Sequence, residues 1–437
     1  MSNIDKADTA WILVSTALVL LMTPALALFY GGLVRAKNVL STFMHSFFAL
    51  AVVSVLWVVV GYSLAFGPTV GGFIGSFAHV GLEGVGMEPR DGTTIPHILF
   101  MAYQLMFAII TPALISGAFA ERIKFSAYVV FTAAWSLLVY SPVAHWVWGP
   151  GGWLGARGSL DFAGGTVVHL TSGISALVFA LVLGPRLGYP KKKSPPHNLT
   201  MSLLGAGLLW FGWFGFNAGS ALGSTGLAAL ALVNTHLAAA TGAASWAAIE
   251  WLRHGKPSSL GVASGLVAGL VAITPAAGFV GPMPAIAIGV MAGALCYVAV
   301  TLKSRFTYDD ALDAFGVHGV GGFLGGVLTA VFASTVWNPA GKDGVLRGGV
   351  GLLGEQMIAL AVAGVYAAAV TFVVAKLIDK VIGLRPAKDD EAEGLDSALH
   401  GEESYATSEG GGHAMEIVDE PEPVVSTATP AVEVQGS

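Results

Sequence analysis

The stretch Asp161-Phe-Ala-Gly-Gly-Thr-Val-Val-His169-Leu-Thr-Ser-Gly173 decides the fold, because it joins an acid and a histidine to an apolar run. The run continues to Leu183 without a charged residue, so the segment is long enough to cross a bilayer as a helix. An ionisable side chain inside a membrane is costly and usually faces a cavity, a pathway or a partner. His169 therefore marks a candidate functional site.

A second stretch repeats this arrangement. It reads Asp310-Ala-Leu-Asp313-Ala-Phe-Gly-Val-His318-Gly-Val-Gly-Gly322, and its acid precedes its histidine by the same eight positions. Two such helices in one chain predict a two-sided pore with one histidine from each side.

The composition indicates an all-α polytopic membrane protein. Of 437 residues, 54% are hydrophobic and only 11% are charged, and the mean hydropathy is +0.72. A membrane barrel would show alternating segments of about ten residues, which this sequence lacks. The 58 glycines favour close helix packing. The single cysteine, Cys296, excludes an intrachain disulfide and a Cys-rich metal site.

Eleven transmembrane helices are predicted. They cover residues 10–32, 41–65, 96–118, 124–144, 161–184, 199–222, 227–251, 259–279, 283–303, 311–335 and 350–381. The first could also be taken for a signal peptide, since Ala25-Leu-Ala27 looks like a cleavage site. Its start lacks a basic region, however, and its apolar run is long enough to span.

The loop charges predict the orientation. Most bases lie in the odd-numbered loops, as at Arg35, Arg122, Arg186, Arg253 and Lys303, whereas the even-numbered loops hold few. By the positive-inside rule, the N-terminus lies outside and the C-terminus inside. An odd number of spans agrees with that orientation.

An internal repeat is visible as well. Ile110-Thr-Pro-Ala113 in the third span recurs as Ile273-Thr-Pro-Ala276 in the eighth, and the acid–histidine pair of the fifth recurs in the tenth. Each motif returns five spans later, and because five is odd, the two halves must have opposite topology. The fold predicted is an inverted five-plus-five repeat plus one extra helix, with its functional site near the midplane.

The composition changes from Arg385 onward. This tail holds 13 of the 27 acidic residues, which leaves the preceding part net basic. The predicted division is a transmembrane domain over 1–384, a cytoplasmic C-terminal segment over 385–410, and a disordered acidic tail over 411–437.

The two histidines admit more than one interpretation. Each could be a core histidine that donates to a backbone carbonyl. Their matched spacing favours a pair across a pore, in which two neutral imidazoles share one proton and resist full charging. A metal site is the rival, but two histidines without further ligands make a poor set.

The acid and the aromatics also have two readings. Asp161 could be a helix N-cap, or a negative group that concentrates cations behind a vestibule. Trp148 could be an interface tryptophan or a cation–π face. Phe107 and Phe216 could be packing residues or a gate, and Ser220 follows Phe216 by four residues, so both share a helix face. Together they describe a route for a small species that is cationic outside and neutral within.

The sequence excludes several classes of function. It has no nucleotide-binding P-loop, so direct ATP-driven transport is not expected, and no Ser/His/Asp or HExxH arrangement. We therefore expect a protein that is not an enzyme, with no cofactor, no metal and no nucleic-acid partner.

Several motifs match one family. They are Ala27-Leu-Phe-Tyr-Gly-Gly-Leu33, Lys37-Asn-Val-Leu40, Gly117-Ala-Phe-Ala-Glu-Arg122, Asp161 to His169, Pro196-His-Asn-Leu199, Gly212-Trp-Phe-Gly-Phe-Asn-Ala-Gly-Ser220 and Asp313 to Gly321. Over residues 8 to 405 the chain resembles the ammonium transporter family (Amt/Mep/Rh), and its bacterial and archaeal Amt branch in particular. The resemblance implies eleven spans, an inverted repeat, and a homotrimer with one pore per subunit.

The resemblance also implies roles for single residues. Trp148 and Ser220 match the outer ammonium-recruitment site, Phe107 and Phe216 the phenyl gate, His169 and His318 the pore histidines, and Asp161 the supporting acid. Tyr103 stands where many bacterial members have Phe, so the recruitment site keeps its aromatic wall with an altered shape or polarity. The tail resembles a cytoplasmic motif that contacts neighbouring subunits and takes part in inhibition by PII signal proteins. Its matching residues are Gly394, Leu395, Asp396, His400 and Tyr405.

The function expected is ammonium transport across the plasma (inner) membrane. Ammonium, or its analogue methylammonium, would be bound outside and deprotonated, and ammonia would cross the pore, with its proton relayed by the histidines. The alternatives are an ammonium sensor that signals through the tail, and an Rh-like channel for a neutral gas.

Overall fold

The structure is a computed structural model, and it describes residues 4–191, 194–306 and 308–405. The chain forms two units, residues 1–404 and 405–437, and of the second only Tyr405 is described. The predicted acidic tail, 411–437, therefore lies outside the described residues.

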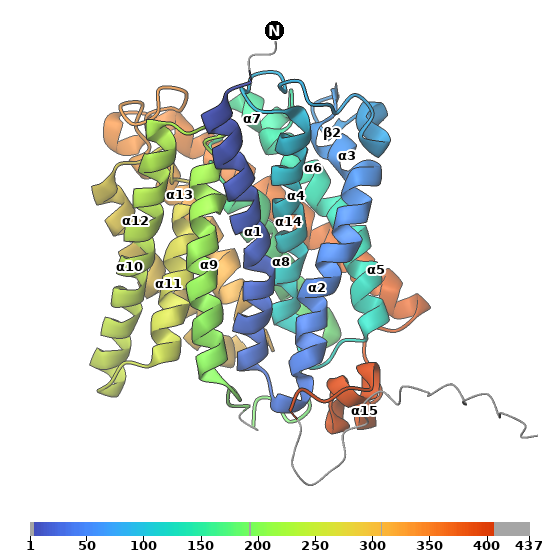
Figure 1. The fold of residues 1–437 in the computed structure, drawn as a ribbon. Helices are drawn as coiled ribbons and strands as arrows, with labels where there is room; N and C mark the ends of the chain where they lie inside the picture. Colours follow the sequence, from blue (N-terminus) through green and yellow to red (C-terminus); the bar gives the residue numbers. More distant parts are fainter. Residues whose placement is uncertain (1–3, 192–193, 307, 406–437) are drawn as a thin grey trace, which may run out of the picture. The chain divides into compact units, whose positions relative to one another are not determined.

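The first unit is helical, as predicted (Figure 1). Its α-helices are α1 Lys6–Leu33, α2 Val39–Leu56, α3 Tyr62–Phe66, α4 His97–Phe119, α5 Phe125–Trp135, α6 Ser141–Trp148, α7 Trp153–Arg157, α8 Thr171–Leu183, α9 Leu199–Gly219, α10 Gly226–His254, α11 Ser259–Ile273, α12 Pro282–Phe306, α13 Val320–Phe332, α14 Val350–Val381 and α15 Lys388–Glu393. The 3₁₀-helices are η1 Ala36–Asn38, η3 Phe77–Leu82 and η7 Val345–Arg347. The π-helices are η2 Trp57–Gly61, η4 Ser136–Tyr140, η5 Gly165–Leu170, η6 Phe315–Gly319 and η8 Asp396–His400. A short antiparallel hairpin joins β1 Thr69–Val70 to β2 Ile74–Gly75.

Ten helical segments of the described chain are long and apolar enough to cross a membrane. They correspond to ten of the eleven expected spans, so the prediction of a polytopic helical membrane protein is confirmed. The eighth expected span, 259–279, contains the shorter apolar helix α11, which ends at Ile273. Pro275 follows two residues later and offers no amide to continue the helix. The count of eleven membrane crossings remains a prediction.

The two histidine segments begin later than their apolar runs suggested. The predicted helices start at residues 161 and 311, whereas the structure starts them at Gly165 and Phe315, in each case with a π-helical turn. The π-helices η5 and η6 carry the histidines and run directly into α8 and α13. Both histidines therefore lie in the first turns of their helices, rather than halfway along.

An aspartate holds the start of each histidine helix. The Asp161 carboxylate accepts four backbone N–H groups, from Gly164, Gly165, Thr166 and Val167, at 2.6–3.0 Å. In the other half, the Asp310 carboxylate accepts the N–H groups of Ala314 at 3.0 Å and Phe315 at 2.8 Å. The N-cap residue of η5 is Gly164 rather than Asp161, but the Asp161 carboxylate still pairs the first amides of the helix, which have no partner within it. An aspartate that binds the first amides of the histidine helix in each half agrees with the predicted repeat.

The two histidine helices touch through glycine. A Cβ atom at Gly173 would overlap the backbone of Gly319, and one at Gly322 would lie 3.0 Å from the His169 Cβ. Small residues allow helix backbones to approach closely, as in other membrane bundles. This close approach is what allows the two histidines to meet.

Candidate functional site

The structure brings the two histidines together. The Nδ1 atoms of His169 and His318 lie 3.3 Å apart, and the ring planes are inclined by 24°. Both residues are buried, at 1% and 5% exposure. Two Nδ1 atoms facing each other hold one proton in the neutral pair, with one ring as donor and the other as acceptor. His169 Nε2 has no hydrogen-bond partner among the described residues.

Trp213 supports the pair, and sequence reasoning missed it. Its ring is stacked against His169 at 5.3 Å with an interplanar angle of 23°. Its indole N–H donates to Thr274 Oγ1 at 3.0 Å, which ties α9 to the end of α11. Thr274 belongs to the repeated Ile-Thr-Pro-Ala motif, but nothing local to the sequence pairs it with a tryptophan 61 positions earlier.

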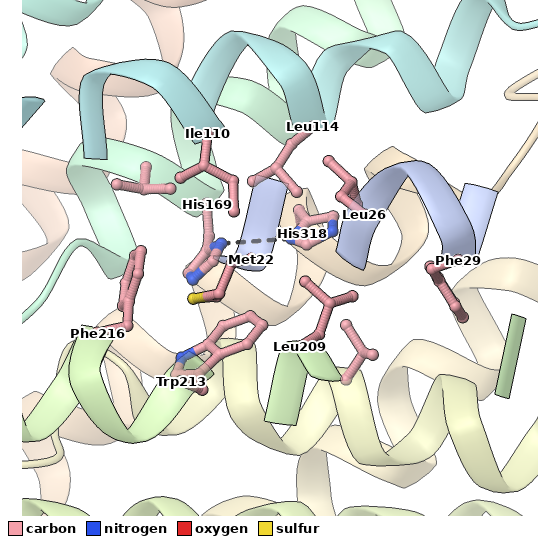
Figure 2. A pocket seen from close by; sticks show the side chains of 12 residues that line it. Met22, Leu26, Phe29, Ile110, Leu114, His169, Leu209, Trp213, Phe216 and His318 are labelled. Carbon is pink, nitrogen blue, oxygen red and sulfur yellow. Dashed lines mark hydrogen bonds between the residues drawn. The ribbon is translucent and has the colours of Figure 1, made fainter. Parts of the chain in front are cut away.

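A narrow apolar cavity surrounds the histidines (Figure 2). In Figure 2, His169 lies between Phe216 and His318, and Phe29 lies beyond His318. The other residues that line the cavity are Met22, Leu26, Ile110, Leu114, Val168, Leu209, Trp213 and Val267. A second cavity shares Phe29, Val267 and His318 with it and adds polar groups, among them Asp313 and Ser264. The walls of the apolar cavity and of the more polar one therefore meet at Phe29, Val267 and His318.

Two phenyl rings close the other side of the apolar cavity. The ring centroids of Phe107 and Phe216 lie 4.3 Å apart, and both residues are buried. Phe216 also faces the His169 ring at 6.0 Å. The Trp148 ring meets Phe107 edge-on at 6.0 Å and remains partly exposed. Each ring therefore neighbours the next in the series Trp148, Phe107, Phe216, His169 and His318.

The polar groups of Trp148, Ser220 and Tyr103 have defined partners. The Trp148 indole N–H donates to the backbone carbonyl of Asp161 at 2.9 Å, so its proton is already used. Ser220 Oγ donates to the Phe216 carbonyl at 2.8 Å. Tyr103 is fully buried, its ring packs against Phe107 at 5.0 Å, and its hydroxyl reaches the end of α9. Asp161 thus contributes to the site through its carbonyl as well as its carboxylate.

A charge cluster lies just after the C-terminal end of α4, whereas Tyr103 and Phe107 lie in the first half of that helix. The Glu121 carboxylate pairs with Arg35 at 2.8 Å and Arg186 at 2.9 Å, and Arg186 also pairs with Asp309 at 2.8 Å. Burial by itself raises the pKa of the Glu121 and Asp309 carboxyls, but their arginine partners lower both pKa values below the usual range. Sequence reasoning used Arg35 and Arg186 as loop charges and did not foresee the cluster.

Two of the predicted regulatory residues, Leu395 and Asp396, contact the chain at the start of α2. The Asp396 carboxylate accepts the N–H groups of Leu40 at 3.0 Å and Ser41 at 2.8 Å. The buried Leu395 donates its N–H to Asn38 Oδ1 at 2.8 Å, and Asn38 Nδ2 donates to Glu121 at 3.0 Å. Asn38 thereby connects the C-terminal segment with the charge cluster.

The other tail residues are placed as follows. Gly394 packs against Lys37 in a backbone conformation with φ of 133°. The His400 ring meets Phe125 edge-on at 5.0 Å, and Tyr405 is 42% exposed. Residues 406–410 of the predicted segment lie outside the described part of the chain.

The described residues contain no group of three or more His, Cys, Asp or Glu side chains that could hold a metal ion. What the site offers is a partly exposed indole ring at Trp148, the Ser220 hydroxyl, a pair of phenyl rings, and two facing imidazoles that line an apolar cavity. Such a site can attract a cation at its aromatic face, and it has proton donors and acceptors deeper within.

Known proteins share this sequence and fold. The profile of the Ammonium Transporter Family matches residues 10–405. The chain is 53% identical over 406 residues to "Ammonium transporter" of Bacillus subtilis, which covers 92% of this chain and 100% of the relative. It is 45% identical over 401 residues to "Ammonium transporter Amt1" of Archaeoglobus fulgidus, again over 92% of this chain and 100% of the relative. Among solved structures, Mep2 of Saccharomyces cerevisiae matches with a TM-score of 0.84 and 41% identity over 89% of each chain. A structure described as "Sensor Amt Protein" matches with a TM-score of 0.83 and 30% identity, over 90% of this chain and 98% of that chain.

Proposed function

The chain belongs to the ammonium transporter family, and from that premise we propose that it recruits ammonium at Trp148 and Ser220, deprotonates it and conducts ammonia past the histidine pair. The observation that carries the proposal is the His169–His318 pair in an apolar cavity behind two phenyl rings. A bare cation would lose its hydration there without replacement, whereas neutral ammonia needs few partners.

The outer end of the route has the chemistry to bind a cation. The partly exposed Trp148 ring provides a cation–π face worth about 0.5–2 kcal/mol, depending on desolvation. The Ser220 hydroxyl donates its hydrogen bond to the Phe216 carbonyl, so the lone pairs of Ser220 Oγ can accept from an N–H donor. Asp161 supports this end by holding the Trp148 indole and the start of η5.

The histidine pair accepts and relays the proton. When one Nδ1 donates to the other, one ring has a bare Nε2 and the other an Nε2–H, so the pair has an acceptor at one end and a donor at the other. A relayed proton reverses this order. The unpartnered Nε2 of His169 is the position from which such a relay begins or ends.

The remaining proposals concern the cell. The protein is a multi-pass membrane protein of a transporter family, and we place it in the plasma (inner) membrane with its N-terminus outside, by the loop charges. It acts as a transporter rather than an enzyme. It forms a homotrimer, and the segment from Gly394 to His400, together with the start of α2, is where a PII signal protein acts from the cytoplasmic face.

The test uses the purified full-length protein in proteoliposomes. An ammonium gradient should drive a current if a proton accompanies ammonia, and no current with ammonium present would contradict relayed transport. Trp148→Leu should lower the selectivity for ammonium, because the cation–π face is lost. Trp337→Leu, a partly exposed tryptophan in the loop after α13, is the matched control and should leave selectivity unchanged.

Two alternatives remain. The observation that supports a sensor is the structural match to "Sensor Amt Protein". Sensing alone predicts no methylammonium uptake in a transporter-deficient cell. A channel for a neutral gas has no use for a cation site, so unchanged selectivity in Trp148→Leu would support it.

A further inference from the structure

The Tyr103 hydroxyl lies at the junction between the gate and the recruitment site. It is 2.9 Å from the Gly215 carbonyl, 3.0 Å from the Phe216 carbonyl and 3.3 Å from Ser220 Oγ. Tyr103 is 0% exposed, so its oxygen is not open to an arriving cation. Its ring packs against Phe107, but the effect of its hydroxyl on the site must pass through these three neighbours.

The end of α9 leaves a carbonyl for these hydroxyls. In a continuing helix the Ser220 N–H would bond to the Phe216 carbonyl, but here it bonds to Asn217 at 3.1 Å. The Phe216 carbonyl instead accepts the Ser220 hydroxyl, and the single Tyr103 hydrogen is within reach of both the Phe216 and the Gly215 carbonyls. A carbonyl has two lone pairs, so that of Phe216 can accept from both hydroxyls.

This arrangement sets the direction of the Ser220 proton. The Ser220 hydroxyl has one hydrogen and two acceptors within reach: the Phe216 carbonyl at 2.8 Å and, because the Tyr103 hydrogen is taken by a backbone carbonyl, the Tyr103 oxygen at 3.3 Å. With the hydrogen committed there, the lone pairs of Ser220 Oγ are left for a donor such as ammonium. Chains of hydroxyls also polarise one another, which makes the terminal oxygen a better acceptor.

The packing around Tyr103 admits the hydroxyl closely. A Cβ atom at Gly219 would lie 2.6 Å from the Tyr103 oxygen and 2.7 Å from the Ser15 Cβ. Glycine at 219 therefore leaves the space in which the phenol hydroxyl reaches the last turn of α9.

We propose that Tyr103 is a positioning residue that holds Ser220 as a hydrogen-bond acceptor for ammonium and thereby sets the apparent affinity of the transporter. The inference rests on the proposed function. It assigns to the tyrosine hydroxyl, absent from a phenylalanine at this position, the job of joining the gate residue Phe216 to the binding residue Ser220.

The first test is Tyr103→Phe in the full-length protein, measured as methylammonium and ammonium transport in proteoliposomes. Loss of one hydrogen bond at the site should raise KM about two- to tenfold, with little change in maximal rate, since the pore below is untouched. Tyr128→Phe is the matched control: it also removes a buried hydroxyl bonded to a backbone carbonyl, that of His45, and should leave KM unchanged. An unchanged KM in Tyr103→Phe, or an equal rise in Tyr128→Phe, overturns the inference.

The second test is a double-mutant cycle with Ser220→Ala. If Tyr103 acts through Ser220, Tyr103→Phe raises KM in the wild type but not in the Ser220→Ala background. Equal effects in both backgrounds would mean that Tyr103 acts independently of Ser220, contrary to the inference. A wild type that moves no ammonium would instead refute the proposed function, so the two failures are distinguishable.

Discussion

The Nδ1 atoms of His169 and His318 face each other at 3.3 Å although 149 positions of the chain separate the two residues. Each histidine is carried by a π-helical turn that an aspartate holds at its start, Asp161 in one half and Asp310 in the other. The two helices cross where Gly173 meets Gly319. The histidine contact is thus the product of two matching halves.

Removing either imidazole should interrupt the proton route. We expect His169→Ala and His318→Ala each to lower transport of methylammonium by about 100-fold, as for the loss of a proton-transfer group. Uptake in a transporter-deficient cell, with protein level measured by immunoblot, checks this. Two variants that transport and select like the wild type would refute the central role of the pair.

The two aspartates should differ in their contribution to stability. Asparagine retains one acceptor oxygen, so Asp161→Asn leaves about two of four buried amides unpaired, at about 1–3 kcal/mol for each. Asp310→Asn loses fewer, since that carboxylate accepts two amides. Thermal unfolding in detergent should show a larger decrease in Tm for Asp161→Asn, and the reverse order would argue against the capping role.

The glycine crossing should tolerate no side chain. Gly173→Ala places a methyl group against the backbone of Gly319, which cannot move aside, so the histidine helices must separate. We expect a loss of folded protein in size-exclusion chromatography. Gly354→Ala is the control, because its Cβ would meet open space on α14, and alanine should stabilise that helix by about 0.5–1 kcal/mol.

The Glu121 cluster should make stability depend on pH. Its arginine partners hold the pKa values of Glu121 and Asp309 below their ordinary values of 4.5 and 3.8. Carboxyls with a lowered folded-state pKa stabilise the protein above the ordinary pKa, and this contribution is lost as the pH falls through the folded-state value. Thermal unfolding should therefore show Tm falling on acidification below about pH 4.5.

Glu121→Gln isolates that effect. It removes the carboxylate partner of the partly exposed Arg35 and leaves Arg186 paired with Asp309 alone, so we expect about 1.5–3 kcal/mol of destabilisation at neutral pH. The difference from the wild type should shrink in acid. Glu355→Gln, which breaks the more exposed pair with Arg157, should cost about 1 kcal/mol or less. A Tm difference for Glu121→Gln that is the same at all pH values would contradict the assigned charge state.

The sequence by itself indicated the membrane class, most helix positions, the two histidines and, among the aromatic residues near them, Phe107, Phe216 and Trp148 but not Trp213. These follow from local quantities, because a bilayer demands long apolar runs and makes each buried ionisable group conspicuous. The late start of the histidine helices at Gly165 and Phe315 did not follow, since hydropathy does not distinguish a helix from an apolar loop held by a carboxylate.

Only the tertiary structure decided which polar groups meet. Hydrogen bonds join Trp213 to Thr274, Tyr103 to the last turn of α9, and Leu395 to Asn38, across 61, 112 and 357 positions of sequence. A hydrogen bond depends on distance and angle in space, and residues so far apart leave no periodic trace in the chain. The stretch from Asp161 to Gly173 illustrates both cases. Its acid and its histidine can be recognised in the sequence. The four amides that Asp161 binds, the contact of Gly173 with Gly319 and the pairing of His169 with His318 are seen only in the folded protein.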